Sequence, residues 1–121
     1  MITPAYVVTT SLNRSKFYNH VAVWCDGRFY HMNESGVHCD TYDDFMAGRE
    51  LLYTTAAVQT PDEIREYYLN NKNRKHNLIF FNCEHFANGA AFGVEKSPTL
   101  IGYILMVVCV LILIVTLILM K

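Results

Sequence analysis

The stretch from His20 to Met32, HVAVWCDGRFYHM, decides how the centre of this 121-residue chain folds. Two runs rich in β-branched and aromatic residues flank the dipeptide Asp26-Gly27, and such runs favour strands. Asp-Gly between them favours a two-residue type I′ turn, because both central residues of that turn need a positive φ. The stretch therefore predicts an antiparallel hairpin whose register is set by the turn.

The predicted register brings two histidines to one face of the hairpin. Ala22 would pair with His31, and His20 shares a face with Ala22 because side chains alternate along a strand. His20 and His31 are then diagonal neighbours, about 7–8 Å apart and within reach of each other directly or through a water. A single histidine on a strand usually has a structural role. For a pair on one face, a catalytic role and a structural role are about equally common.

The remaining chain before residue 100 predicts further short elements. Residues 5–10 (AYVVTT) and 50–58 have the composition of strands, whereas residues 33–48 are polar and are expected to be irregular. A helix is predicted from the Thr60-Pro61 pair to about Asn70, because threonine can cap a helix and proline suits its first position. These elements predict a compact α+β domain on an antiparallel sheet.

A second helix is predicted to begin after Asn82, which follows the short apolar segment 78–81. Asn82 can cap this helix and Gly93 can close it at the C′ position. Its apolar residues recur at spacings of three and four, on the face turned toward the core: Cys83, Phe86, Ala87, Ala90 and Ala91. The unpaired amides at the helix start are expected to lower the pKa of the Cys83 thiol.

A contact between this helix start and the histidine face of the hairpin would create a reactive pair. Cys83 would be the nucleophile, His20 the base that takes its proton, and His31 the residue that orients the His20 ring. His85 points roughly the other way along the helix and is a poor candidate for the base. The alternative is a reduced core cysteine with incidental histidines.

The C-terminal part predicts a membrane anchor. Residues 100–120 contain no charged residue, and as a helix they would span about 30 Å, the thickness of a bilayer's hydrocarbon core. Residues 1–16 hold no apolar run long enough for a signal peptide. We therefore expect a tail-anchored protein whose domain faces the cytosol, where a disulfide between Cys25 and Cys39 is not expected.

Charge excludes one class of partner. Nine basic and eleven acidic residues precede Leu100, so the domain lacks the overall positive charge of a nucleic-acid-binding protein. The short basic cluster of Lys72, Arg74 and Lys75 could face anionic lipid headgroups or form a solvated loop, which is the more common situation.

Two motifs resemble those of a known family. Residues 82–86 (NCEHF), with the later Phe92-Gly93, resemble the NC box of the lecithin:retinol acyltransferase-like family, which includes small phospholipase A/acyltransferases and viral H-box/NC proteins. Residues 17–20 (FYNH), with the downstream Asp26-Gly27 and His31, are similar to the family's H-box. The order of the two histidines and the cysteine, and a single membrane helix just after the NC box, also match.

The resemblance implies a fold, a site and a domain plan. The fold would be a circularly permuted papain-like thiol hydrolase fold, with a domain at 1–93, a linker at 94–99 and a transmembrane helix at 100–120. Catalysis would use Cys83, His20 and His31, with Tyr18 helping to stabilise the oxyanion, and without a metal or cofactor.

The short linker favours a lipid substrate. Six residues span at most about 20 Å, which would hold Cys83 near the headgroup plane, where phospholipid acyl esters are concentrated. We therefore expect a phospholipase A/acyltransferase, with water, an amine or a lyso-lipid as acyl acceptor. The alternatives are a weakly active or inactive membrane adaptor that binds partners, and a thiol peptidase. A zinc site is disfavoured because no CxxC or HxxxH pair is present.

Overall fold

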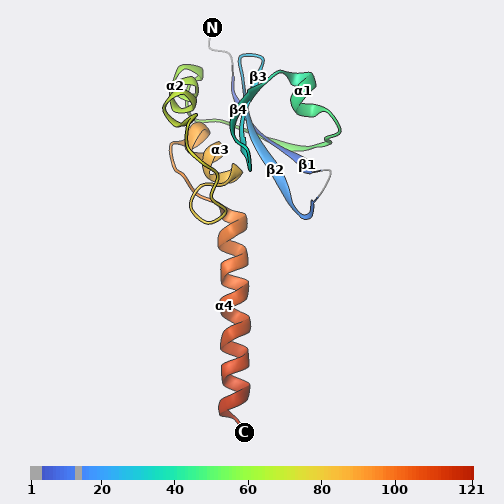
Figure 1. Ribbon diagram of the computed structural model, residues 1–121, viewed down its shortest axis with the longest axis vertical. Coiled ribbons are helices and arrows are strands. Elements are labelled where there is room, and N and C mark those ends of the chain that lie inside the picture. Colours follow the sequence, from blue (N-terminus) through green and yellow to red (C-terminus); the bar gives the residue numbers. More distant parts are fainter. Residues whose placement is uncertain (1–3, 13–14) are drawn as a thin grey trace.

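The computed structural model describes residues 4–12 and 15–121, without the side chains of residues 12 and 15–18. The described part is an α+β domain from which one long helix projects, so that the C-terminus lies far from the sheet (Figure 1). The predicted α+β class is therefore confirmed, and the antiparallel sheet packs against the helix that carries Cys83, as expected.

Within the described residues the sheet has five strands in the order β4-β3-β2-β1-β5, and every neighbouring pair is antiparallel. The strands are β1 (Tyr6–Leu12), β2 (Ser15–Cys25), β3 (Arg28–Asn33), β4 (Gly36–Asp40) and β5 (Leu51–Ala56). Four of the five follow one another in chain order across the sheet, which leaves only β5 to return to the far edge beside β1.

The β2–β3 hairpin has the predicted turn and register. Asp26 and Gly27 have φ values of 50° and 77°, as a type I′ turn requires. Ala22 pairs with His31 in the ladder, so His20 and His31 share one face of the sheet.

The expectation that residues 33–48 are irregular was wrong. They contain β4 and a short helix, α1 (Tyr42–Met46), capped by Thr41. A second two-residue turn at Glu34-Ser35 pairs Asn33 with Gly36, whose φ is 124°. All five residues of β4 are only half-buried, because it lies at an edge of the sheet, and such a strand carries little of the alternation by which strands are recognised.

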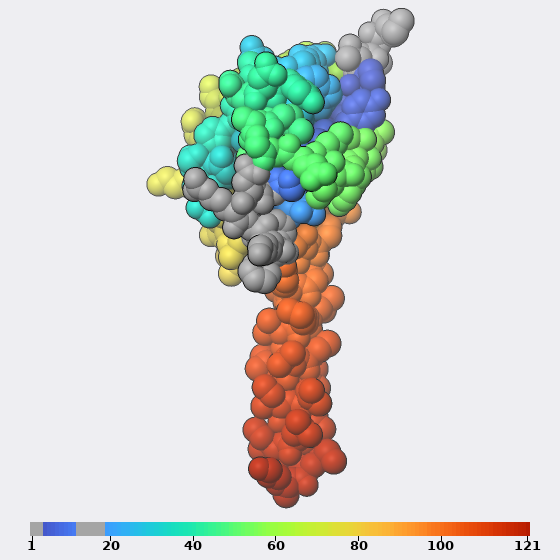
Figure 2. Space-filling view, turned by 90° about the vertical axis from the view of Figure 1, so that its right-hand side faces the viewer, coloured from blue at the N-terminus to red at the C-terminus, as the bar shows by residue number. Residues whose placement is uncertain are grey.

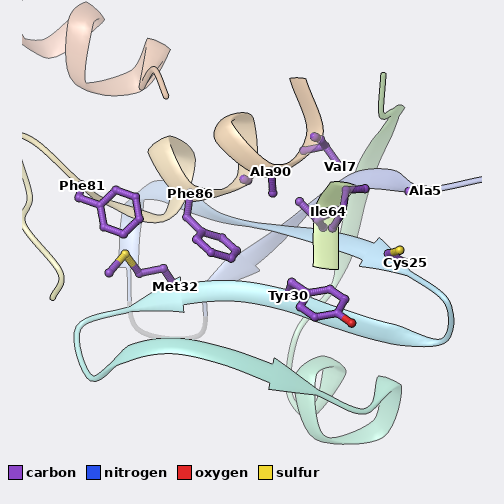
Figure 3. Close-up of a cluster of buried hydrophobic side chains, with 12 residues drawn as sticks. Ala5, Val7, Cys25, Tyr30, Met32, Ile64, Phe81, Phe86 and Ala90 are labelled. Carbon is purple, nitrogen blue, oxygen red and sulfur yellow. The ribbon is translucent and has the colours of Figure 1, made fainter. Parts of the chain in front are cut away.

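Two helices, α2 (Pro61–Asn71) and α3 (Cys83–Phe92), have the predicted caps. The Thr60 hydroxyl accepts the Glu63 amide at the start of α2, and the Asn82 side chain accepts two amides at the start of α3. Gly93 ends α3 in the left-handed conformation with φ 76°. Four residues of the predicted apolar face of α3, Phe86, Ala87, Ala90 and Ala91, are buried in the larger core cluster with Val23. Figure 3 shows Phe86 and Ala90 in this cluster with Met32 and Ile64.

The last helix, α4 (Pro98–Leu119), stands outside the core. It begins two residues before the predicted apolar span because Ser97 caps it. Its 22 residues have a mean hydropathy of 3.1 in the most apolar window, and none of that window is buried. Figure 2 shows it projecting uncovered below the domain. This C-terminal helix is long and apolar enough to cross a membrane.

Candidate active site

Three side chains of the sheet form a hydrogen-bonded chain. His20 Nε2 lies 3.1 Å from His31 Nδ1, and His31 Nε2 lies 2.5 Å from Asp40 Oδ2. Both histidine residues are 3% exposed. Both contacts follow from strand register. His31 on β3 pairs with Ala22 on β2, so His20 is its diagonal neighbour there. On the other side His31 pairs with His38 on β4, so Asp40 is its diagonal neighbour on that strand.

The chain of hydrogen bonds assigns the position of each proton. A carboxylate can only accept, so His31 Nε2–H donates to Asp40 and leaves His31 Nδ1 as an acceptor. His20 Nε2–H must then donate to His31 Nδ1. This leaves His20 Nδ1 without a proton and available to accept one, which is the state that a general base needs.

Phe45 holds the two imidazoles in place. Its ring, 2% exposed on α1, lies 5.7 Å from the His20 ring and 4.9 Å from the His31 ring, measured between centroids. Burial in this pocket lowers the pKa of His20 to about 3, with the charges of His31 and Arg49 acting in the same direction. His20 is therefore neutral at physiological pH.

Cys83 is the first residue of α3, as predicted, and is 9% exposed. The expected lowering of its pKa was wrong: burial raises the pKa of the Cys83 thiol. The backbone amides of Val21, Glu84 and Cys83 itself act in the opposite direction, but the loss of hydration outweighs them. Cys83 is therefore a neutral thiol at rest, and its thiolate forms only when a base removes the proton.

The two histidines and the body of α3 lie on opposite faces of the sheet. The body of α3 covers the opposite face of the sheet, with Val23 and Met32, whereas Ala22 and Phe45 lie on the histidine face in a second core cluster. Figure 1 shows α3 and α1 on opposite sides of the sheet. Both faces carry apolar residues, so the sequence pattern did not decide which one the helix covers.

Cys83 nevertheless shares a cavity with His20. The described β2–β3 ladder stops at the Ala22–His31 pair, so the sheet does not separate the start of α3 from His20 at this end. The cavity has a volume of about 740 Å³, within the range of small-molecule sites. Its walls include His20, Arg49, Asn82, Cys83, Leu100 and Tyr103, so the first turns of α4 form part of it.

The sequence analysis did not identify Asp40 and Arg49. Asp40 could have been found from the same diagonal rule that found His31, had the Glu34-Ser35 turn been recognised. Arg49 lines the cavity. Burial lowers the pKa of its guanidinium, while the nearby Asp40 and Cys83 act in the opposite direction. Within the described side chains, Arg49 Nη1 is the buried polar atom that has no hydrogen-bond partner.

The remaining residues considered in the sequence analysis are Tyr18, His85 and the cysteines other than Cys83. The Tyr18 side chain is outside the described residues. His85 does not face His20: its Nδ1 accepts the backbone N–H of Asn82 and completes the cap of α3. All four cysteines are free, and the side chains that the structure describes contain no group of three or more histidine, cysteine or acidic residues positioned to hold a metal ion.

Hydrogen bonds join the start of α3 directly to the start of α4. Asn82 Nδ2 donates to Ser97 Oγ at 3.2 Å, and Ser97 Oγ donates to Glu84 Oε1 at 2.9 Å. Glu84 Oε1 also accepts the Thr99 amide. Ser97 is 2% exposed, so the connection between the two helices is a packed joint rather than a flexible linker.

Comparison with protein-family models, with curated proteins and with solved structures finds no match. The resemblance to the lecithin:retinol acyltransferase-like family is a resemblance of the two sequence motifs alone.

The burial of His20 predicts that the domain loses stability on mild acidification. The pKa of His20 is about 3 in the folded state and about 6.5 in an unfolded chain. Between these values the unfolded state binds more protons, so the free energy of unfolding falls as the pH is lowered from 7 to 5. Urea unfolding in detergent micelles, followed by Trp24 fluorescence, measures this dependence.

The variant His20→Gln tests whether this residue is responsible. Burial also lowers the pKa of His31, so the variant should keep a dependence of the same sign but with a shallower slope. An unfolding free energy that is constant from pH 7 to pH 5 in the wild type, or an unchanged slope in the variant, would contradict the assignment.

Proposed function

We propose that this protein is a membrane-anchored thiol phospholipase A or acyltransferase that forms an acyl-thioester on Cys83. The observation that carries the proposal is a single cavity lined by Cys83, by His20, and by the first turns of an apolar helix long enough to span a bilayer. The NCEHF and H-box resemblance supports the same chemistry.

The first step is acyl transfer to the thiol. His20 Nδ1 removes the Cys83 proton as Sγ attacks the ester carbonyl carbon, while the His31–Asp40 pair stabilises the imidazolium that forms. The Cys83 backbone amide, at the helix start, is a natural donor to the oxyanion, and by resemblance Tyr18 is a second. Collapse of this intermediate breaks the ester C–O bond, and the lyso-lipid alcohol leaves with the proton from His20.

The second step releases the acyl group. Water, an amine or a lyso-lipid hydroxyl gives a proton to His20 and attacks the thioester carbonyl carbon. Collapse breaks the C–S bond, and the Cys83 sulfur regains its proton from His20. The neutral state of His20 at rest suits both half-reactions, because the same atom accepts a proton at the start of each.

The chemical character of the cavity supports a phospholipid as substrate. Met32, Leu78, Leu100 and Tyr103 give it an apolar wall suited to an acyl chain. Arg49 lines the cavity and offers a positive charge for the lipid phosphate. A soluble peptide would gain nothing from an active site whose wall includes the start of α4.

We place the domain on the cytosolic side of the membrane crossed by α4. The free thiols of Cys25, Cys39 and Cys83 support this location, because reduced cysteines persist in the cytosol and are oxidised in secretory compartments. No cofactor is required by the two steps above.

Substitution of the reactive residues should separate their roles. Cys83→Ser should reduce release of labelled acyl groups from phosphatidylcholine vesicles by roughly a thousandfold or more, because a serine alkoxide forms far less readily than a thiolate. His20→Ala should be about as damaging, since the two residues act as a unit. His31→Gln should cost less, roughly 10- to 100-fold, because glutamine can still hydrogen-bond to the His20 ring.

The matched controls are the other domain cysteines. Cys25→Ser and Cys39→Ser should keep most of the activity. Full activity of Cys83→Ser together with loss in Cys25→Ser would refute the assignment. Wild-type protein that releases no acyl group but binds a partner protein, unaffected by Cys83→Ser, would favour the adaptor alternative.

The proposed topology predicts how glycosylation tags behave. An N-glycosylation tag placed after Lys121 should be modified when the protein inserts into microsomes, because that end crosses to the lumen. A tag at the N-terminus should stay unmodified. The reverse pattern, read as a gel shift sensitive to glycosidase, would refute the cytosolic location.

A further inference from the structure

Three consecutive large apolar side chains are exposed in the segment between α2 and α3. Leu78, Ile79 and Phe80 are 61%, 54% and 75% exposed. We call residues 78–80 the apolar loop. A contiguous exposed apolar patch usually marks an interaction site.

The apolar loop has a fixed shape. Asn77 and Phe81 exchange two backbone hydrogen bonds of 2.8 Å across it. Inside this turn Asn77 Oδ1 accepts the amides of Ile79 and Phe80, each at 3.0 Å. Phe81 is 3% exposed and belongs to the core. The turn therefore anchors its last residue inside the domain and directs the preceding side chains outward.

The apolar loop lies beside the start of α4. Asn82 Nδ2 donates to the Leu78 carbonyl at 3.1 Å and to Ser97 Oγ, the cap of α4, at 3.2 Å. Leu78 also lines the Cys83 cavity together with Leu100 and Tyr103. Figure 1 shows the α2–α3 connection reaching down to the top of α4. The loop and the first turns of α4 are thus continuous parts of one apolar surface.

Exposed lysines lie close in sequence to this surface. Lys72 and Lys75 precede the apolar loop, and Lys96 directly precedes the cap of α4. Arg74, by contrast, is engaged within the domain, where it pairs with Glu95 and stacks over the Phe81 ring. An apolar surface with lysines at its edge matches the layers of a bilayer, in which anionic headgroups border the hydrocarbon.

We propose that the apolar loop inserts into the same bilayer as α4 and forms a second membrane contact of the domain. This inference rests on the membrane role proposed for α4. Two contacts instead of one fix the orientation of the domain, so that the Cys83 cavity faces the lipid surface between them. The acyl chain of a phospholipid can then reach Cys83 along the apolar wall of Leu78 and Leu100 without crossing water.

Depth-dependent quenching tests the insertion without reference to activity. In a Trp24→Phe background, single tryptophans are placed by Phe80→Trp, by Tyr103→Trp on α4, and by Tyr42→Trp. Tyr42 is a 55% exposed residue of α1, on the opposite side of the sheet from α3 (Figure 1). The full chain is reconstituted into vesicles of phosphatidylcholine and phosphatidylserine that contain brominated lipid.

We expect bromine to quench the tryptophans at positions 80 and 103 strongly, and the one at position 42 little. If the tryptophan at position 103 is quenched but the one at position 80 is quenched no more than the one at position 42, this inference is overturned. The membrane role of α4 would then still hold. The absence of quenching at 103 overturns the membrane role of α4, and this inference with it.

A kinetic experiment tests the consequence for the substrate. The double variant Ile79→Ser/Phe80→Ser should lower turnover of vesicle phospholipid at least 10-fold, while turnover of a water-soluble short-chain thioester stays within twofold. Its matched control is Val58→Ser, which removes a 79% exposed apolar side chain elsewhere and should change neither rate. Equal loss on both substrates, or no loss on vesicles, contradicts the proposal. If the loop binds a soluble protein instead of lipid, the double variant should turn over vesicle phospholipid at the wild-type rate.

Discussion

The two-residue turn at Asp26-Gly27 is the constraint on which the candidate site depends. It fixes the pairing of Ala22 with His31, and a slip of one residue would move one histidine to the opposite face of the sheet. A second tight turn then places Asp40 diagonal to His31. The His20–His31–Asp40 chain is therefore a product of strand register. Side chains held by a sheet keep their geometry better than side chains on loops, which suits a base that must present one particular nitrogen to its substrate.

Asn82 connects this site to the rest of the molecule. Its side chain caps α3, and its amide donates both to Leu78 and to the Ser97 hydroxyl that caps α4. One residue thus holds the start of the reactive helix, the apolar loop and the start of the apolar helix together. The position of Cys83 relative to α4 is then set by hydrogen bonds and packing. A freely jointed linker would give the same average distance without a fixed orientation.

Features that depend on local chemistry were predicted correctly from the sequence, whereas an edge strand and the effect of burial on a pKa were not. The Asp26-Gly27 turn and the Asn82 cap need only a few neighbouring residues. The strand containing Asp40 was missed because a half-buried edge strand lacks clear alternation. The sign of the Cys83 pKa shift was wrong because helix position is visible in a sequence but burial is not. The face covered by α3 was not predicted, because apolar residues occur on both faces of β2.

The most direct test of the central claim is the mass of the protein itself. Full-length protein in vesicles is mixed with phosphatidylcholine of one defined acyl chain, quenched with acid after short intervals, and weighed intact before peptide mapping. The account predicts an increase equal to one acyl group, located on the peptide that contains Cys83, removed by hydroxylamine and absent in Cys83→Ala. Phospholipid hydrolysis without any adduct at any time, or an adduct on Cys25 or Cys39, would contradict it.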